Sequence, residues 1–341
     1  METQTERARW GWRLGAFAGL PAGVLLFCAY RFAYDTEIAY FRTGSLLFLA
    51  ACVLLAIGVL SAVAMWGATR KKVSLSGAPT NGRTGTFFAL FAAVLYLAAC
   101  VRNVLTCNAP GKLEIIATAT LVLPAAYLLC IGIGGQEKTA QATPWLALGG
   151  ALSAIAQLFR QYFDATLPLN APARHLETLA TIGVLLFFLA EARDRIGTGY
   201  ATASFSAFAN GTAAVLSAGI GLAHTAYTLS GARFAPHAAA NPLWFAALLA
   251  TGLLALCRAV NLPALFCPYH APFVSGNDSR KKKQQSKDDP SADGAGDTAD
   301  TADAENTTNA TAADVPADNT DNTGNTGNTG NTGNTDTTGE N

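Results

Sequence analysis

Five ionisable side chains stand close to the ends of long apolar segments: Arg102, Glu114, Arg160, Glu177 and His224. An arginine held in place by a carboxylate can bind an anionic group of a small solute, because its planar guanidinium offers several donors in a fixed geometry. We therefore take these residues as a candidate polar vestibule. The alternative interpretation is structural: each arginine ties one helix to the acid on the next, or extends its charged end into a polar surface layer.

Two arginine–glutamate pairs accompany matching stretches of sequence. Residues 108–119 read NAPGKLEIIATA, and residues 170–182 read NAPARHLETLATI. Both have an Asn-Ala-Pro turn, a basic residue, Leu-Glu, and a Thr four residues after the Glu, on the same helix face. Arg102 precedes the first stretch and Arg160 the second. The match predicts a repeated helical hairpin of about 60 residues whose copies point the same way. Coincidence in a chain rich in Ala and Leu is the alternative.

Sequence signatures of catalysis are missing. The chain has no Gly-Lys-Ser/Thr phosphate loop, no Gly-x-Ser-x-Gly elbow and no His-Glu-x-x-His. His175 and Glu177, two residues apart, would point to different faces of a helix, which disfavours joint metal binding. The seven cysteines lie mostly within apolar runs and form no Cys-x-x-Cys pair, so we expect them to pack as small hydrophobic residues. We expect no enzyme, no cofactor and no metal site.

The apolar segments that carry these side chains are long enough to cross a bilayer. Of 341 residues, 51% are hydrophobic and only 13% charged, whereas soluble domains carry roughly 25% charged residues. A span needs about 20 apolar helical residues. The sequence predicts an all-α, polytopic helical membrane protein with about eight transmembrane helices in four antiparallel hairpins. The predicted spans lie near 14–33, 44–66, 86–103, 113–134, 144–162, 174–191, 204–229 and 242–260.

Charge placement predicts the orientation of these spans. Most Lys and Arg residues between spans fall on the side that holds both termini, so we expect both termini to be cytoplasmic. The five vestibule residues then lie on the outer side. Other ionisable residues expected there are Arg31, Asp35, Glu37, Asp164, Arg174 and His175.

Three regions follow from composition: a transmembrane helical domain over 1–262, a basic juxtamembrane segment over 263–287, and an acidic low-complexity tail over 288–341 that we expect to be disordered. The basic segment should lie against anionic lipids of the inner leaflet. Basic residues elsewhere stand between spans without interleaved aromatics, so no nucleic-acid partner is expected. The lipid-binding residues would be Arg280, Lys281, Lys282 and Lys283.

Irregular positions within the spans leave two interpretations open. Asn210 and Gly211 fall inside the seventh span, where they indicate either a helix broken at mid-membrane or a helix packed through small residues. Pro21 and Pro124 also fall inside spans and predict kinks, because proline lacks the backbone N–H that the helix needs.

Residues 158–197, reading LFRQYFDATLPLNAPARHLETLATIGVLLFFLAEARDRIG, resemble a group of uncharacterised multi-span membrane proteins of anaerobic Gram-positive bacteria. The resemblance implies a bacterial cell membrane and brings no known activity with it. Two functions are compatible with the sequence. The first is transport or binding of a small solute through the outward-facing vestibule. The alternative is a membrane scaffold or sensory component that binds a protein partner.

Overall fold

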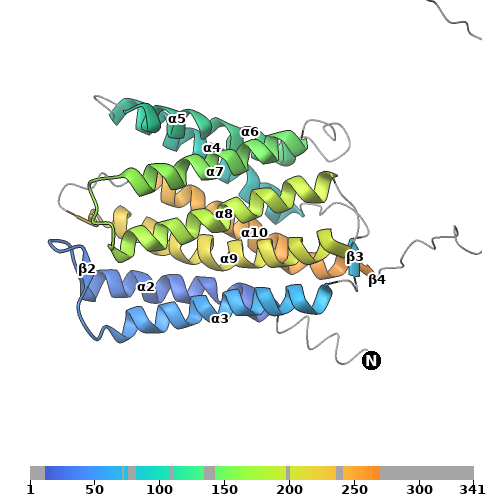
Figure 1. Cartoon of the computed structure of the whole chain (residues 1–341), viewed down its shortest axis with the longest axis horizontal. Coiled ribbons are helices and arrows are strands. Elements are labelled where there is room, and N and C mark those ends of the chain that lie inside the picture. Colours follow the sequence, from blue (N-terminus) through green and yellow to red (C-terminus); the bar gives the residue numbers. More distant parts are fainter. Residues whose placement is uncertain are drawn as a thin grey trace, which may run out of the picture. The chain divides into compact units, whose positions relative to one another are not determined.

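The structure is a computed structural model that describes residues 12–70, 73–75, 82–106, 111–133, 143–196, 200–235 and 241–268. Long helices run side by side through these residues, and two short pairs of strands lie at their ends (Figure 1). The helices are α2 (Gly19–Ala33), α3 (Leu46–Thr69), α4 (Arg83–Thr106), α5 (Lys112–Thr120), α6 (Val122–Ile133), α7 (Thr143–Phe163), α8 (Pro172–Ile196), α9 (Tyr200–Leu229), α10 (Pro242–Asn261) and the short η1 (Leu262–Leu265).

All eight predicted spans coincide with helical segments, which confirms the all-α polytopic fold. The largest difference is at the end of α8, which continues to Ile196 instead of ending near 191. Within the described residues, seven segments are long and apolar enough to cross a membrane. The protein is therefore a multi-pass membrane protein. The seven segments are Trp12–Ala33, Leu46–Thr69, Arg83–Thr106, Lys112–Ile133, Pro172–Ile196, Ala203–Leu229 and Pro242–Ala264.

Helix α7, the predicted fifth span, is long enough but less apolar than the other seven. Its polar residues Ser153, Gln157 and Gln161 recur every four residues and are buried against neighbouring helices. Its large apolar residues, among them Leu152 and Phe159, point outward. This arrangement, polar inside and apolar outside, suits a helix that faces lipid on one side, because polar groups in a bilayer must be satisfied within the protein.

Helix α9 lies at the centre of the bundle and packs against α2, α3, α8 and α10. Small residues allow this close approach. A side-chain carbon added at Gly252 of α10 would lie 2.2 Å from the backbone nitrogen of Ala218 in α9. One added at Gly23 of α2 would lie 2.4 Å from the carbonyl oxygen of Gly219. Contact between backbones is the main route to tight helix association in lipid.

The seventh predicted span is continuous, so the broken-helix interpretation of Asn210 and Gly211 is wrong. Asn210 Nδ2 donates to the carbonyl oxygen of Ser206, four residues earlier on the same helix, at 2.9 Å. A carbon added at Gly211 would lie 2.2 Å from the ring of Trp12. The glycine therefore accommodates a neighbouring aromatic ring, which is the small-residue packing that the sequence left as the second interpretation.

The two prolines interrupt their helices in the same way. Regular helix is lost at Ala18 and at Leu121, each three residues before a proline. In both places the amide bonds the carbonyl three residues earlier: Ala18 to Gly15 at 3.1 Å and Leu121 to Thr118 at 3.2 Å. Such 3₁₀-type bonding accommodates the missing N–H of proline.

Two antiparallel strand pairs, absent from the sequence prediction, lie at opposite ends of the bundle (Figure 1). β1 (Tyr34–Asp35) pairs with β2 (Tyr40–Phe41) between α2 and α3. At the other end β3 (Val73–Leu75) pairs with β4 (Phe266–Pro268), so the start of the predicted basic segment is paired here. The inferred lipid contacts of Arg280 to Lys283 and the tail over 288–341 lie outside the described residues.

Replacing Gly252 by alanine is expected to lower the free energy of unfolding by about 1–3 kcal/mol, because the added methyl group forces α9 and α10 apart. Gly67→Ala in α3 is the matched control, since nothing lies within 4 Å of a carbon added there. Thermal unfolding of the purified protein in detergent measures both. Equal melting temperatures for the two variants would contradict the tight α9–α10 contact.

Candidate functional site

Glu177, in the first turns of α8, is the centre of a polar cluster at the end of the bundle that carries β1 and β2. Its Oε1 accepts hydrogen bonds from Trp244 Nε1 of α10 at 2.9 Å and from Gln161 Nε2 of α7 at 3.1 Å. Arg160 Nη2 lies 3.8 Å from the same oxygen. One carboxylate therefore joins α7, α8 and α10, and the predicted pairing of Arg160 with Glu177 is present.

The loop between α7 and α8 closes over this cluster. Asp164 Oδ1 accepts from the amide and the hydroxyl of Thr166 at 2.8 and 2.7 Å, which turns the chain after α7. The buried guanidinium of Arg174 donates to the carbonyl oxygen of Asp164. Asn241 caps α10 by accepting from the amides of Leu243 and Trp244. These contacts fix the positions of the polar side chains in this cluster.

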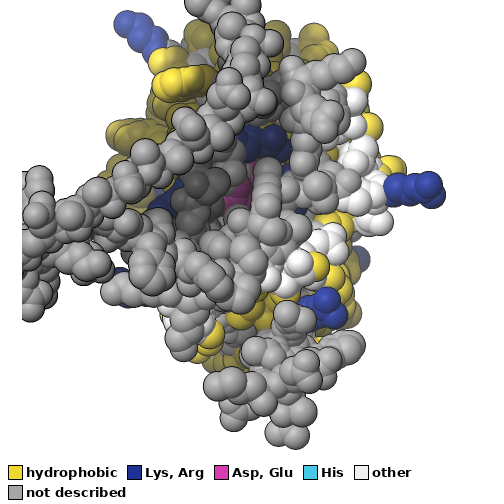
Figure 2. Space-filling view, turned by 90° about the vertical axis from the view of Figure 1, so that its right-hand side faces the viewer, with side chains coloured by type: hydrophobic (Ala, Val, Ile, Leu, Met, Phe, Trp, Pro, Cys, Tyr) yellow, Lys and Arg dark blue, Asp and Glu magenta, His cyan; other side chains and the backbone are white. Residues whose placement is uncertain are grey.

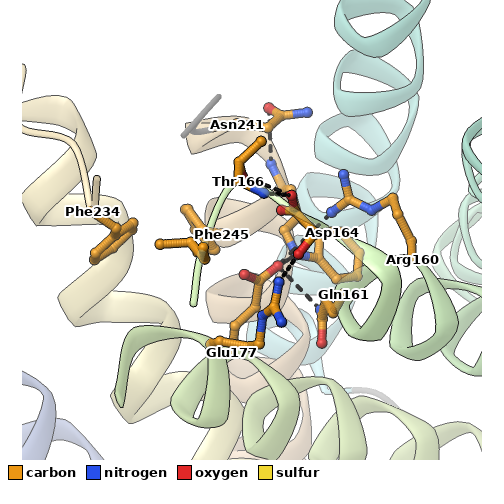
Figure 3. A pocket seen from close by; sticks show the side chains of 11 residues that line it. Arg160, Gln161, Asp164, Thr166, Glu177, Phe234, Asn241 and Phe245 are labelled. Atoms are coloured by element: carbon orange, nitrogen blue, oxygen red, sulfur yellow. Dashed lines mark hydrogen bonds and ion pairs between the residues drawn. The ribbon is translucent and has the colours of Figure 1, made fainter. Parts of the chain in front are cut away.

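A pocket of about 50 Å³ lies between these groups. A cavity needs roughly 10–15 Å³ by this measure to hold one water molecule, so the pocket accommodates a group of a few heavy atoms. Polar side chains gather on one side of it, and Phe234 and Phe245 face them from the other (Figure 3). It is lined by Arg160, Gln161, Asp164, Thr166, Leu167, Arg174, Glu177, Phe234, Asn241, Trp244 and Phe245.

His224 lies behind the aromatic side of the pocket and does not line it. Its ring centroid is 4.7 Å from that of Phe234 and 5.0 Å from that of Phe245. Its Nε2 is 3.0 Å from the hydroxyl of Tyr30 in α2. Nearby, the hydroxyl of Tyr34 donates to the carbonyl oxygen of Phe234 at 2.9 Å, and burial raises the pKa of Tyr34, which keeps that donor protonated. The histidine supports the pocket wall.

Arg102 and Glu114, the other two predicted vestibule residues, stand outside this pocket. Arg102 is on the last turns of α4, and Glu114 is in the first turn of α5. Both are partly buried. Among the described residues, Glu114 belongs to none of the ion pairs. The structure thus brings together one of the two predicted arginine–glutamate pairs.

The two matching hairpins nevertheless share a hydrogen bond. The amide residue directly after each arginine donates to the threonine four residues after each glutamate. Gln161 Nε2 donates to Thr181 Oγ1 at 2.8 Å, and Asn103 Nδ2 donates to Thr118 Oγ1 at 3.4 Å. This equivalence supports a repeated hairpin. The copies differ in that Pro124 interrupts the helix in the first, whereas α8 continues unbroken.

A second polar network, missed from the sequence, lies at the opposite end. Glu191 of α8 and Arg258 of α10, each 2% exposed, form an ion pair at 3.1 Å. The same oxygen, Glu191 Oε2, accepts from the hydroxyl of Tyr127 in α6 at 2.5 Å and lies 3.8 Å from Arg195. An acidic side chain is visible at this end, with basic side chains beside it (Figure 2). The available signal was Arg258, an arginine inside the predicted span 242–260.

Comparison with known protein families, with curated proteins and with solved structures finds no match for this chain. Inference about its function therefore depends on the two polar regions.

Removing Arg258 is expected to be among the most costly substitutions. Arg258→Ala leaves Glu191 buried without its closest counter-charge, a change that typically costs about 3–5 kcal/mol. Arg233→Ala is the control, because Arg233 is exposed and contributes its carbonyl oxygen to Tyr227; surface changes of this kind stay within about 0.5 kcal/mol. Thermal unfolding in detergent compares them, and similar melting temperatures would show that the network does not stabilise the fold.

Proposed function

We propose that the protein binds a small solute carrying an anionic group in the outer pocket, as a solute-binding or solute-transporting membrane protein. The observation that carries this proposal is the hydrogen bonding of Arg160. Its Nη2 is 3.8 Å from Glu177, close enough for charge attraction but beyond the 2.7–3.2 Å of an N–H···O hydrogen bond. Its Nε is buried with no hydrogen-bond partner among the described residues. Arg160 is therefore held beside Glu177 by charge attraction, its side chain is 27% exposed, and its Nη2 is not hydrogen-bonded to that carboxylate.

The composition of the pocket wall supports the same class of ligand. Arg174 lines the pocket together with Arg160, so the wall contains two arginines. Two carboxylates, Asp164 and Glu177, balance their charge. The anionic group of a solute gains charge-assisted hydrogen bonds when it takes the place of a wall carboxylate beside the arginines. A positive group on the same solute lies close to the carboxylates and the aromatic faces. A zwitterion carries both kinds of group, so it can bind to the arginines and to the carboxylates and aromatic rings at the same time.

We further propose that the protein resides in a bacterial cell membrane with both termini in the cytoplasm, so that the pocket faces outward. The excess of basic residues on the side of the termini supports this orientation, and the resemblance of residues 158–197 supports the bacterial membrane. In that orientation the solute reaches the pocket from outside the cell.

Arg160→Lys tests the pocket directly, because lysine keeps the charge but loses the guanidinium fork. Glycine, acetate and inorganic phosphate serve as zwitterionic, monoanionic and polyanionic probes, and calorimetry or a thermal shift of the purified protein measures their binding. We expect glycine to bind best and Arg160→Lys to weaken binding at least about tenfold, the effect of losing roughly 1.4 kcal/mol. Glu177→Asp should weaken it in the same way.

Arg233→Lys is the matched control and should bind like the wild type, since Arg233 does not line the pocket. If Arg160→Lys and Glu177→Asp only lower the yield of folded protein, the cluster is structural. If no probe binds and a second protein co-purifies in mild detergent, the scaffold or sensory interpretation replaces the proposal.

The proposed orientation is tested with single cysteines and a thiol reagent that does not cross membranes. Thr43→Cys, in the exposed loop between α2 and α3, should react in intact cells. Gly82→Cys, exposed just before α4 at the opposite end, should react only after the cells are opened. The reverse labelling pattern would place the pocket on the cytoplasmic side.

A further inference from the structure

Asp194 occupies an unusual position at the inner end of α8. It is only 8% exposed. Its Oδ2 accepts a hydrogen bond from the hydroxyl of Ser206 in α9 at 2.6 Å. Its Oδ1 is buried with no hydrogen-bond partner among the described residues. An ionised carboxylate with one oxygen unsatisfied and almost no access to water is costly.

Asn210, one turn further along α9, brings a second unsatisfied acceptor to the same place. Its Nδ2 donates to Ser206 Oγ at 3.1 Å, and Ser206 in turn donates to Asp194. The amide group therefore lies directly beside the serine that holds the carboxylate. Asn210 is fully buried, and its Oδ1 has no donor among the described residues. Asp194 Oδ1 and Asn210 Oδ1 are thus two buried acceptor oxygens without a donor among the described residues. The donor groups of Ser206 and Asn210 already form other hydrogen bonds.

The charged groups that act on Asp194 come from two helices. Glu191 and Arg195 are on α8 itself, and Arg258 is on α10. Tyr127 of α6 faces the same network and donates its hydroxyl to Glu191. Both arginines lie closest to Glu191, at 3.1 and 3.8 Å. Glu191 consequently takes the main counter-charge, while Asp194 depends on a hydroxyl group.

We infer that Asp194 is a buried proton-binding site, formed with Ser206 and Asn210. The carboxylate takes a proton from water, forming an O–H bond at Oδ1, and its charge changes from −1 to 0. The new O–H is a donor in a group that otherwise offers only acceptors, and the loss of charge removes the burial cost.

A proton suits this site better than a metal cation. A hard cation such as sodium or calcium needs several oxygen ligands and an excess of negative charge. Here Arg195 and Arg258 lie beside Glu191 and also act on Asp194, so the cluster has no excess of negative charge to attract such a cation. A proton needs only one oxygen and one neighbouring acceptor. The proton site lies on α8 and α9, at the opposite end of α8 from the pocket beside Glu177.

Infrared spectroscopy of the full-length protein in lipid nanodiscs tests the site, since a protonated carboxyl group has a C=O stretching band that an ionised one lacks. We expect a band that grows as the pH falls and is lost in Asp194→Asn. Glu177→Gln, which removes the partly buried acid at the other end, is the matched control and should retain the band. Persistence of every titrating band in folded Asp194→Asn would overturn the inference.

Ser206→Ala keeps the test decisive if Asp194→Asn does not fold. It removes the hydrogen bond to Oδ2, which stabilises the ionised form, so the midpoint of the band should move to higher pH by about one unit. An unchanged midpoint would show that the band does not belong to Asp194. The titration is repeated with sodium replaced by choline at equal ionic strength. A midpoint that depends on sodium would overturn the proton site in favour of a sodium site.

Discussion

The need to satisfy buried charge from within the protein governs how these helices are joined. Hydrocarbon offers no hydrogen bonds, so a carboxylate inside the bundle must meet its donors on neighbouring helices. Helix α8 carries such an acid near each end. Glu177 bonds to Trp244 of α10 and lies beside Arg160 of α7. Glu191 bonds to Arg258 of α10 and Tyr127 of α6. The α8–α10 pair is thus fastened at both ends.

Close backbone packing complements these polar contacts. Small residues of α9 let α2 and α10 approach it until backbone atoms touch, as at Gly219 and Ala218. Hydrophobic driving force is weak between helices in lipid, so packing density and a few hydrogen bonds carry the association. Ser217 Oγ, which donates to the carbonyl oxygen of Ala180 at 2.8 Å, is one of the hydrogen bonds that join α9 to α8. The central helix is therefore the most buried, whereas α3 and α7 keep apolar faces on the outside.

Sequence patterns predicted the helices well because span length and apolar composition are local properties. They also located Arg160 and Glu177, since a repeated motif stands beside a turn. The partners of Glu177 on α10 could not be predicted, because Trp244 lies 67 residues away and its approach depends on how hairpins pack. The Glu191–Arg258 pair is equally distant in sequence. From the sequence alone, a charged residue at the end of a span cannot be told from a charged residue in a loop. Only the packing of a neighbouring helix shows that it is buried.

The two polar regions differ in what lies between them. Glu177 and Glu191 are fourteen residues apart on one helix, which is about 21 Å at a rise of 1.5 Å per residue. The intervening residues 182–190 read IGVLLFFLA, and Phe187 and Phe188 are fully buried. Along α8, then, an apolar stretch separates the pocket beside Glu177 from the network around Glu191. Binding in the pocket needs no change in that stretch. Within this stretch α7 and α8 pack tightly, because a carbon added at Gly150 of α7 would lie 2.6 Å from the ring of Phe188.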